Sequence, residues 1–420
     1  MKKMDTVKHK WIEKRLVDGK QRVYLFGHCV LSRPLPAAPL AEYTAWLSAL
    51  KNDKSTFVPF TKTPFVRTNS DPKIFAYYLP QFHAIEENDN AHGKGFTEWT
   101  NVASCVPQFV GHEQPKIPYD VGFYNLLMPG VMERQVEIAK AYGLYGFCFY
   151  YYWFSGKKVL EKPLEYFLHS SIDFKFHFCW ANENWSKLWD GGDREVILKQ
   201  ELKEADAEKF FADILPYIKD ERYEKIDNKP LLMIYRPSLF DKTVFCQFIA
   251  TLQRLAKQEG FNGLYIMAAN AFEKISPKDY SCEGVIEFPP HQLPRKEIAV
   301  RKINPKLPLA IHDLTEYIAK RKYIYPTSYP VWKACFPSWD NTPRKLYSHA
   351  WVWKISPEQY KTWLAGILAW TKQTYPVGKQ YVYINAWNEW AEGAILEPTV
   401  RRGYQNLEIV KQCLENIRMS

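Results

Sequence analysis

From residue 73 onward, short apolar runs rich in aromatic and β-branched residues alternate with longer segments whose apolar residues recur at helical spacing. This alternation predicts repeated strand–helix units and a parallel sheet. Eight strands are expected, over residues 73–82, 145–153, 174–182, 230–237, 263–269, 284–290, 329–339 and 380–390. The sequence therefore predicts an α/β protein with a (β/α)8 TIM barrel.

Helical segments are expected after each of these strands. The clearest one places Val131, Val136, Ile138 and Ala139 on one side and stops at a glycine. Further helices are expected over residues 203–218, 241–258, 357–374 and 405–417. An open, doubly wound sheet is the rival fold, but it normally carries a glycine-rich first turn, which is absent after Phe82.

The region before residue 73 does not show the alternation of strands and helices that follows it. Residues 1–72 are expected to form a small N-terminal appendage or barrel cap, and residues 73–420 the barrel. A strand is expected within residues 21–31 and a helix within residues 38–53. The basic N-terminus is not followed by an apolar segment, and no apolar run reaches the roughly 18 residues of a membrane span. With eight cysteines and no C-x-x-C pair, reduced thiols and a cytoplasmic location are expected.

Composition narrows the function classes. Aromatic residues make up 16% of the chain, which suits dense packing and stacking against sugar rings. The net charge of +10 leaves nucleotide-linked sugars, an anionic membrane or a lipid-linked glycan open as partners, whereas nucleic acid is not expected because no binding module is present. P-loop, GxGxxG and HExxH motifs are absent, so neither a cofactor nor a metal is expected. The segment "WDGGD", residues 189–193, has D-x-x-D spacing rather than the D-x-D of metal-dependent sugar transferases.

Polar and aromatic residues gather where the predicted strands end, which is the active-site face of a barrel. By strand, these candidate substrate-binding residues are Tyr77, Gln81 and His83; Tyr150 and Tyr152; Trp180, Asn182, Glu183, Asn184 and Trp185; Tyr235 and Arg236; Glu287; Trp339, Asp340 and Asn341; Trp387, Asn388 and Trp390. The loop after the first strand adds Glu98, Trp99 and Asn101. Any one of them could be a structural hydrogen-bonding residue, but together they suit a carbohydrate site.

Two glutamates, Glu389 and Glu392, stand three residues apart at the end of the eighth strand. Glycosidic bond cleavage needs an acid or base at the glycosidic oxygen and a second carboxylate acting at the sugar. Mutual repulsion and the neighbouring indoles are expected to raise the pKa of the pair, which would keep one carboxyl protonated near neutrality. The E-x-x-E spacing is common in surface loops, so the prediction depends on its place in the barrel.

Several segments, among them "YYLPQFHAIEENDNAHGKGFTEWTNV", "FCWANENWSKLWDG", "PSWDNTPR" and "NAWNEWAEGAILEPT", resemble the WbsX-type family of bacterial polysaccharide-biosynthesis proteins. That family is similar to glycoside hydrolase family 99, the endo-α-mannosidase-type enzymes. The resemblance covers about residues 73–415. It implies a (β/α)8 barrel, a glycan substrate and a place in O-antigen, capsule or lipopolysaccharide biosynthesis.

The resemblance also implies roles for the two glutamates, since the NEWxEG motif supplies both catalytic residues of family 99. Glu389 would be the base that deprotonates the sugar 2-hydroxyl to form a 1,2-anhydro sugar, and Glu392 the acid that protonates the leaving oxygen. Ala391 stands where those hydrolases carry His. The sequence thus predicts a retaining glycosidase of α-mannosidase type, with a glycosyltransferase or transglycosylase, or a non-catalytic glycan-binding protein, as alternatives.

Overall fold

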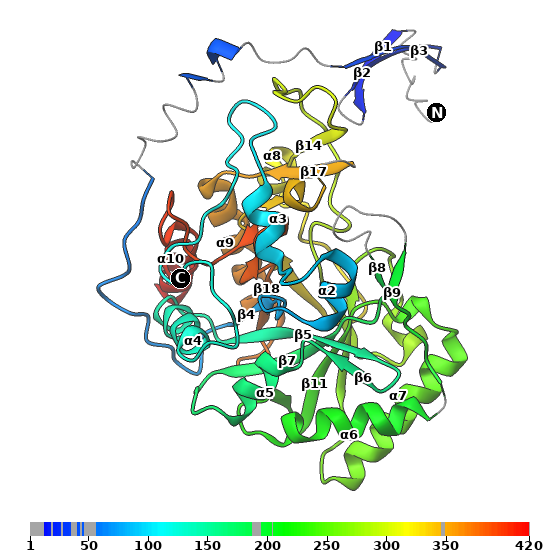
Figure 1. Ribbon diagram of the computed structural model, residues 1–420. Helices are drawn as coiled ribbons and strands as arrows, with labels where there is room; N and C mark the ends of the chain where they lie inside the picture. Colours follow the sequence, from blue (N-terminus) through cyan, green and yellow to red (C-terminus); the bar gives the residue numbers. More distant parts are fainter. Residues whose placement is uncertain are drawn as a thin grey trace, which may run out of the picture.

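The computed structural model describes residues 12–17, 20–26, 28–34, 40–42, 44–45, 56–186, 195–203, 205–345 and 349–419. Its centre is a closed barrel of eight parallel strands (Figure 1). The strands are β4 (Lys73–Tyr78), β5 (Gly146–Phe154), β7 (Lys175–Trp180), β11 (Lys229–Ile234), β12 (Tyr265–Asn270), β13 (Gly284–Glu287), β15 (Val331–Cys335) and β18 (Tyr381–Ile384). Each pairs with the next, and β18 pairs with β4 to close the ring. The predicted (β/α)8 fold and its eight strands are confirmed.

Helices surround the barrel, as Figure 1 shows. They are α4 (Val131–Ala141), α5 (Lys162–His169), α6 (Asp206–Lys219), α7 (Lys242–Gln258), α8 (Thr315–Ala319), α9 (Pro357–Thr374) and α10 (Gln405–Met419). Their apolar faces pack on the strands, which is how an amphipathic segment becomes a stable helix. One connection departs from the expected alternation, because β12 is followed only by the 3-10 helix η3 (Pro277–Tyr280).

The loops at the carboxyl ends of the strands carry additional short elements. After β4 come α2 (Glu86–His92) and α3 (Glu98–Ser104), and β5 continues into a hairpin with β6 (Lys157–Val159). A small sheet is formed by β14 (Leu309–Asp313), from the connection between β13 and β15, with β17 (Ala350–Lys354) and β16 (Trp339–Asp340), which follow β15. The 3-10 helix η4 (Thr342–Arg344) lies between β16 and β17 in the chain and contacts β17. After β18 the chain forms β19 (Asn388–Glu389), the 3-10 helix η5 (Trp390–Glu392) and β20 (Ala394–Ile395).

Aromatic rings fill the inside of the barrel. Tyr383 of β18 stacks on Phe75 and Tyr77 of β4 with ring centroids 5.8 and 5.5 Å apart, and Trp332 of β15 stacks on Tyr381 at 4.3 Å. All five side chains are buried. Part of the aromatic content of the chain therefore serves packing rather than ligand binding.

The N-terminal segment contains a separate antiparallel sheet of β1 (Ile12–Val17), β2 (Lys20–Leu25) and β3 (His28–Pro34). The single strand expected within residues 21–31 is thus two strands. They are interrupted at Phe26, whose φ of 50° is a turn conformation that a strand cannot contain. The helix expected within residues 38–53 lies largely outside the described residues, although residues 40–42 and 44–45 are helical.

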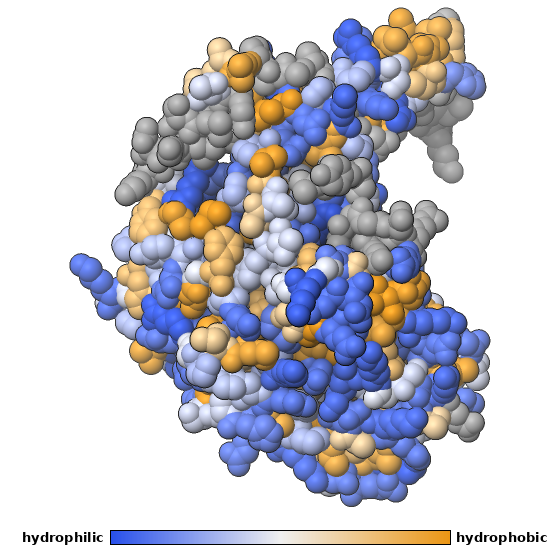
Figure 2. All heavy atoms as spheres, viewed as in Figure 1, coloured by the Kyte–Doolittle hydropathy of each residue, from blue (hydrophilic) through white to orange (hydrophobic). Residues whose placement is uncertain are grey.

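The surface is mixed in character. In the view of Figure 2, hydrophilic residues cover most of the face, and apolar residues form scattered groups between them. Within the part of the chain that the structure describes, no helix combines the length and the apolar character that crossing a membrane requires.

Candidate active site

Three loops meet at the mouth of the barrel and form the candidate active site. They are the loop after β4 with α3, the loop after β15 with η4, and the loop after β18 with η5, and the three short helices contact one another. The indole rings of Trp99 in α3 and Trp390 in η5 have centroids 5.5 Å apart. Residues from distant parts of the sequence are therefore held against the end of β18.

Arg344 of η4 is the centre of the charged groups in this site. Its two terminal nitrogens donate hydrogen bonds to Oε1 of Glu392 at 2.8 Å and to Oε2 of Glu389 at 3.3 Å. The same guanidinium donates to Glu98 of α3 at 3.1 Å. The Arg344 and Glu98 side chains are only 8% and 2% exposed, and Glu392 is the most accessible of the three carboxylates at 20%. The predicted pair, Glu389 and Glu392, is thus bridged by one arginine.

Burial raises the pKa of Glu389 to about 8, and the negative charges of Glu392 and Glu98 add to this effect. Arg344 and a hydrogen bond from Tyr150 act in the opposite direction without cancelling it. The raised pKa favours the protonated form of Glu389 in the unliganded protein. A buried carboxyl that is protonated beside a more accessible carboxylate is a usual arrangement for acid–base chemistry.

Two tyrosines of β5 border the pair. Burial and the charge of Glu389 raise the pKa of both Tyr150 and Tyr152, so both keep their phenolic protons. Tyr152 accepts a hydrogen bond from Gln81 at 2.9 Å. Tyr150 stacks on Tyr77, which connects the site to the aromatic interior of the barrel. These four predicted residues belong to the site or its floor.

The turn that carries the two glutamates is fixed by hydrogen bonds. The Asn388 side chain accepts from the backbone nitrogen of Leu79 at 2.7 Å and donates to its carbonyl at 3.0 Å, which ties the loop after β18 to β4. The Trp390 indole donates to Glu397 at 2.6 Å. Asn388 and Trp390, both predicted as substrate-binding residues, are fully buried and act here as supports.

Asp340 supports the loop of Arg344. It accepts hydrogen bonds from Gln114 and from the backbone nitrogen and hydroxyl of Thr342, and it pairs with His112 at 2.7 Å. Burial alone would raise the pKa of Asp340, but His112 and Lys116 outweigh it and hold that pKa well below its usual range. Asn341 accepts from the backbone nitrogen of Trp351 at 2.8 Å. Asp340 and Asn341 thus shape η4.

A second polar cluster lies at the ends of β7 and β11. Arg236 forms ion pairs with Glu183 and with Glu273, and Asn182 exchanges two hydrogen bonds with the Arg236 backbone. Burial raises the pKa of Tyr235, which follows β11, and the charges of Glu183 in this cluster and of Glu392 in the glutamate pair add to this effect. The cluster and the glutamate pair thus both act electrostatically on Tyr235.

Glu287 is not brought to the glutamate pair. Its carboxylate accepts hydrogen bonds from Lys333 at 2.8 Å and Tyr325 at 2.6 Å. The Lys333 ammonium lies 5.1 Å from the ring centroid of Trp370 in α9, so this ion pair is on the helical side of β15. Successive strand residues point to opposite faces, and Glu287 has the outward register.

Trp180 also faces outward, where it packs on Phe210 of α6 and Phe248 of α7. The remaining predicted residues support loops or lie in them. Trp185 is buried beneath the β5–β6 hairpin, and the Asn184 side chain accepts a hydrogen bond from the backbone nitrogen of Gln200. Trp339 packs on Trp353, and Trp387 packs on Phe147. Asn101 lies in α3, and His83 is buried after β4. Burial lowers the pKa of His83 to about 4, so it is neutral.

Three residues of the site have no counterpart in the prediction. Arg344 ends the "PSWDNTPR" segment, which was a usable signal, but the sequence prediction gives this residue no role. Glu397 is buried and accepts from Tyr124, Gln135 and Trp390, and burial raises its pKa to about 7 despite these donors. Lys116 donates to the carbonyl of Gly393 and to Ser338. Glu397 lies in the "NAWNEWAEGAILEPT" segment, which was likewise a usable signal, whereas Lys116 lies in none of the segments quoted above.

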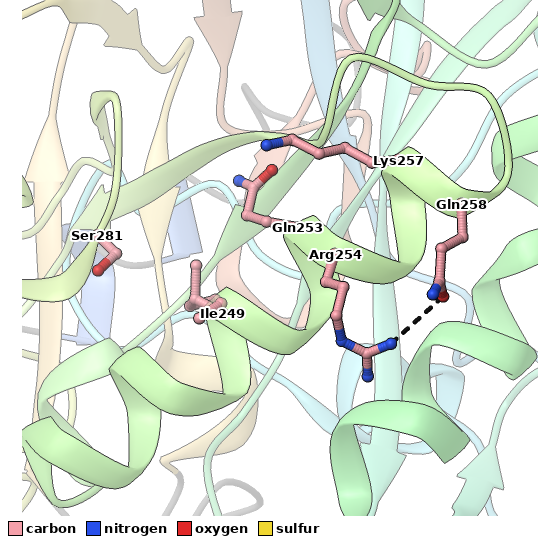
Figure 3. Close-up of a pocket in the computed structure, with 7 residues that line it drawn as sticks. Ile249, Gln253, Arg254, Lys257, Gln258 and Ser281 are labelled. Atoms are coloured by element: carbon pink, nitrogen blue, oxygen red, sulfur yellow. Dashed lines mark hydrogen bonds between the residues drawn. The ribbon is translucent and has the colours of Figure 1, made fainter.

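Among the described residues, no group of three or more His, Cys, Asp and Glu side chains could hold a metal ion. The "WDGGD" segment lies outside the described residues. A surface cavity in Figure 3 belongs to another part of the protein, along α7, where Ile249, Gln253, Arg254, Lys257 and Gln258 line it with Ser281. None of these residues contacts the glutamate pair.

Comparison with known proteins identifies the family of the chain. The matching family model is that of the WbsX glycosyltransferases, over residues 74–410, and the chain belongs to this family. Two curated relatives named WxcX come from strains of Xanthomonas campestris pv. campestris. They are 35% and 38% identical over 95% and 81% of this chain. The chain spans 62% and 49% of their lengths.

Solved structures with the same fold include a glycoside hydrolase-like protein and the glycoside hydrolase family 99 (GH99) endo-α-mannosidase of Bacteroides thetaiotaomicron, solved with BIS-TRIS-Propane. Each superposes with a TM-score of 0.52, at 14% and 12% identity. The matches cover 86% and 83% of this chain and 98% of each structure. At this identity the likeness extends to the barrel fold and no further.

Proposed function

We propose that the protein is a retaining glycan-cleaving enzyme of α-mannosidase type that acts on bacterial surface polysaccharide. The observation that carries this proposal is the glutamate pair at the mouth of the barrel, where a buried Glu389 with a raised pKa lies beside the more accessible Glu392 and one arginine bridges the two. Two carboxyl groups in unlike environments at one end of a barrel are what glycosidic bond cleavage requires. Membership in a polysaccharide-related family and the barrel shared with an endo-α-mannosidase support the substrate class.

The reaction we propose has two steps and needs no cofactor. In the first, Glu389 takes the proton of the sugar 2-hydroxyl, O2 bonds to the anomeric carbon, and the glycosidic oxygen leaves with a proton from Glu392. In the second, Glu392 takes a proton from water, the water oxygen opens the 1,2-anhydro ring at the anomeric carbon, and O2 recovers its proton from Glu389. Two inversions at one carbon retain its configuration.

The resting protonation state adds a requirement to this scheme. The raised pKa of Glu389 favours its protonated form before substrate binds, so a base role requires that proton to move to Glu392 as the glycan covers the more accessible carboxyl. Glycosyl fluorides test the assignment, because fluoride leaves without an acid. With an α-mannosyl fluoride we expect Glu392→Gln to keep much of its first-step rate and Glu389→Gln to lose it. The opposite pattern would exchange the two roles.

Transfer to another sugar is the second candidate, and the family name favours it. Transglycosylation needs only an acceptor hydroxyl in place of water in the second step. A nucleotide-sugar donor fits less well, because Arg344 is already paired with three carboxylates and the site has more negative than positive groups. Calorimetric titration with UDP- and GDP-sugars should give no heat, and micromolar binding would favour the nucleotide-dependent transferase.

A further inference from the structure

A guanidinium shared among three glutamate side chains, two of them buried, is an unusual feature of this site. Arg344 reaches Glu392 and Glu389 through two different terminal nitrogens, so its rigid planar fork defines the separation of the two carboxyl groups. One guanidinium therefore bridges the two carboxyl groups.

Glu98 comes from a different loop and has no place in the proposed reaction. Its side chain is 2% exposed, and a buried carboxylate is very costly unless it is paired. Its two oxygens accept from Nε of Arg344 at 3.4 Å and from a terminal nitrogen at 3.1 Å. Glu98 therefore orients the arginine from the side opposite to Glu392.

We propose that the Glu98–Arg344 pair is the positioning device of the candidate active site, holding the Glu389 and Glu392 carboxyl groups in place and balancing their charges. This inference rests on the proposed function for its catalytic meaning. Its structural content does not, because the ion pairs exist without substrate. Arg344 is a positioning residue, since it acts through the two glutamates.

The opposite charges of Arg344 and Glu98 predict a measurable effect on the titration of Glu389, which serves as the signature of the proposal. Arg344 favours the ionised form of Glu389 and Glu98 disfavours it, so removing one or the other should move the Glu389 titration in opposite directions. The other titratable groups that face the pair are Glu392 itself, Tyr150 and Tyr152 of β5, and Tyr235 after β11. The three tyrosines stay neutral over the relevant range, so they do not obscure this signature.

The test is a ¹³C NMR titration of the glutamate carboxyl groups in the full chain without substrate, with the Glu389 signal assigned from its loss in Glu389→Gln. We expect Arg344→Gln to raise the Glu389 midpoint by about one pH unit or more and Glu98→Gln to lower it by about half a unit or more. Arg344→Lys should give an intermediate value, because an ammonium keeps the charge but cannot bridge in the same way. The control Arg254→Gln, on the exposed face of α7 in Figure 3, should leave the midpoint unchanged.

Shifts in the same direction, or no shift, for Arg344→Gln and Glu98→Gln would overturn the proposal. If Arg344→Gln fails to fold, Arg344→Lys and Glu98→Gln still decide, because they must move the midpoint in opposite directions. Failure of the proposed function would look different. Glu389→Gln and Glu392→Gln would then keep full activity while the opposite shifts were still observed.

Discussion

Arg344 and Glu392 are 48 residues apart in the sequence, yet a guanidinium nitrogen of the first lies 2.8 Å from a carboxylate oxygen of the second. The contact joins the loop after β15 to the loop after β18. It shows that the glutamate pair is not a surface E-x-x-E but part of a buried ionic network. The consequences of this arrangement can be tested at several positions.

The first prediction concerns the turn that follows Glu392. Gly393 has a φ of +59°, and a Cβ there would lie 3.0 Å from Nζ of Lys116 and 3.1 Å from Cβ of Asp340. Gly393→Ala should therefore lower the free energy of unfolding by roughly 2–4 kcal/mol, from backbone strain and crowding together. It should also reduce turnover, because the displaced turn carries Glu392. Urea unfolding and activity assays check both effects.

Gly378 provides the matched control for this substitution. It also has a positive φ, +87°, but nothing lies within 4 Å of a Cβ placed there. Gly378→Ala should cost only the strain, about 1–2 kcal/mol, and leave turnover unchanged. Equal losses of stability and activity in the two variants would contradict the role given to the Gly393 turn.

The second prediction concerns Glu397, which accepts hydrogen bonds from Tyr124, Gln135 and Trp390 in the interior. Glu397→Ala leaves these buried donors without a partner and should destabilise the protein by roughly 3–5 kcal/mol. Glu397→Gln keeps the volume and one acceptor oxygen, so its loss should be smaller. Thermal and urea unfolding give the comparison. Two variants of equal stability would show that packing, and not hydrogen bonding, is what Glu397 contributes.

The third prediction is a dependence of stability on pH. The pKa of Glu389 is raised to about 8 in the folded protein from a usual value near 4.5. Between these values the unfolded chain gives up this proton while the folded protein keeps it, so stability falls as the pH rises from about 4.5 to 8. Glu389→Gln removes this contribution. The melting temperature of Glu389→Gln minus that of the unchanged protein should therefore increase between pH 5 and pH 8. A difference in melting temperature that does not change with pH would contradict the raised pKa.

The barrel could be predicted from the sequence because its strands are short apolar runs at regular intervals. This alternation is visible in the sequence without any knowledge of how the side chains pack. Glu389 and Glu392 could be found because they follow the last of these runs. Glu287 shows the limit of that reasoning. Its position at the end of β13 was predicted correctly, but its register points it to Lys333 on the outer side of the barrel.

Arg344 shows a second limit. It lies in a loop, and its three partners come from two other loops, so nothing in the local sequence indicates which charges it meets. Loop conformation depends on such tertiary contacts, here the bonds of Asp340 to His112 and Thr342. Periodicity carries no information about them.

The most direct test of the central claim is ¹H NMR of the products formed from α-mannosides and purified bacterial surface polysaccharide. We expect cleavage with the α configuration in the first product, and loss of roughly 10²–10⁴-fold in turnover for Glu389→Gln and for Glu392→Gln, both folded. Product of inverted configuration, or full turnover in both glutamine variants, would contradict the account.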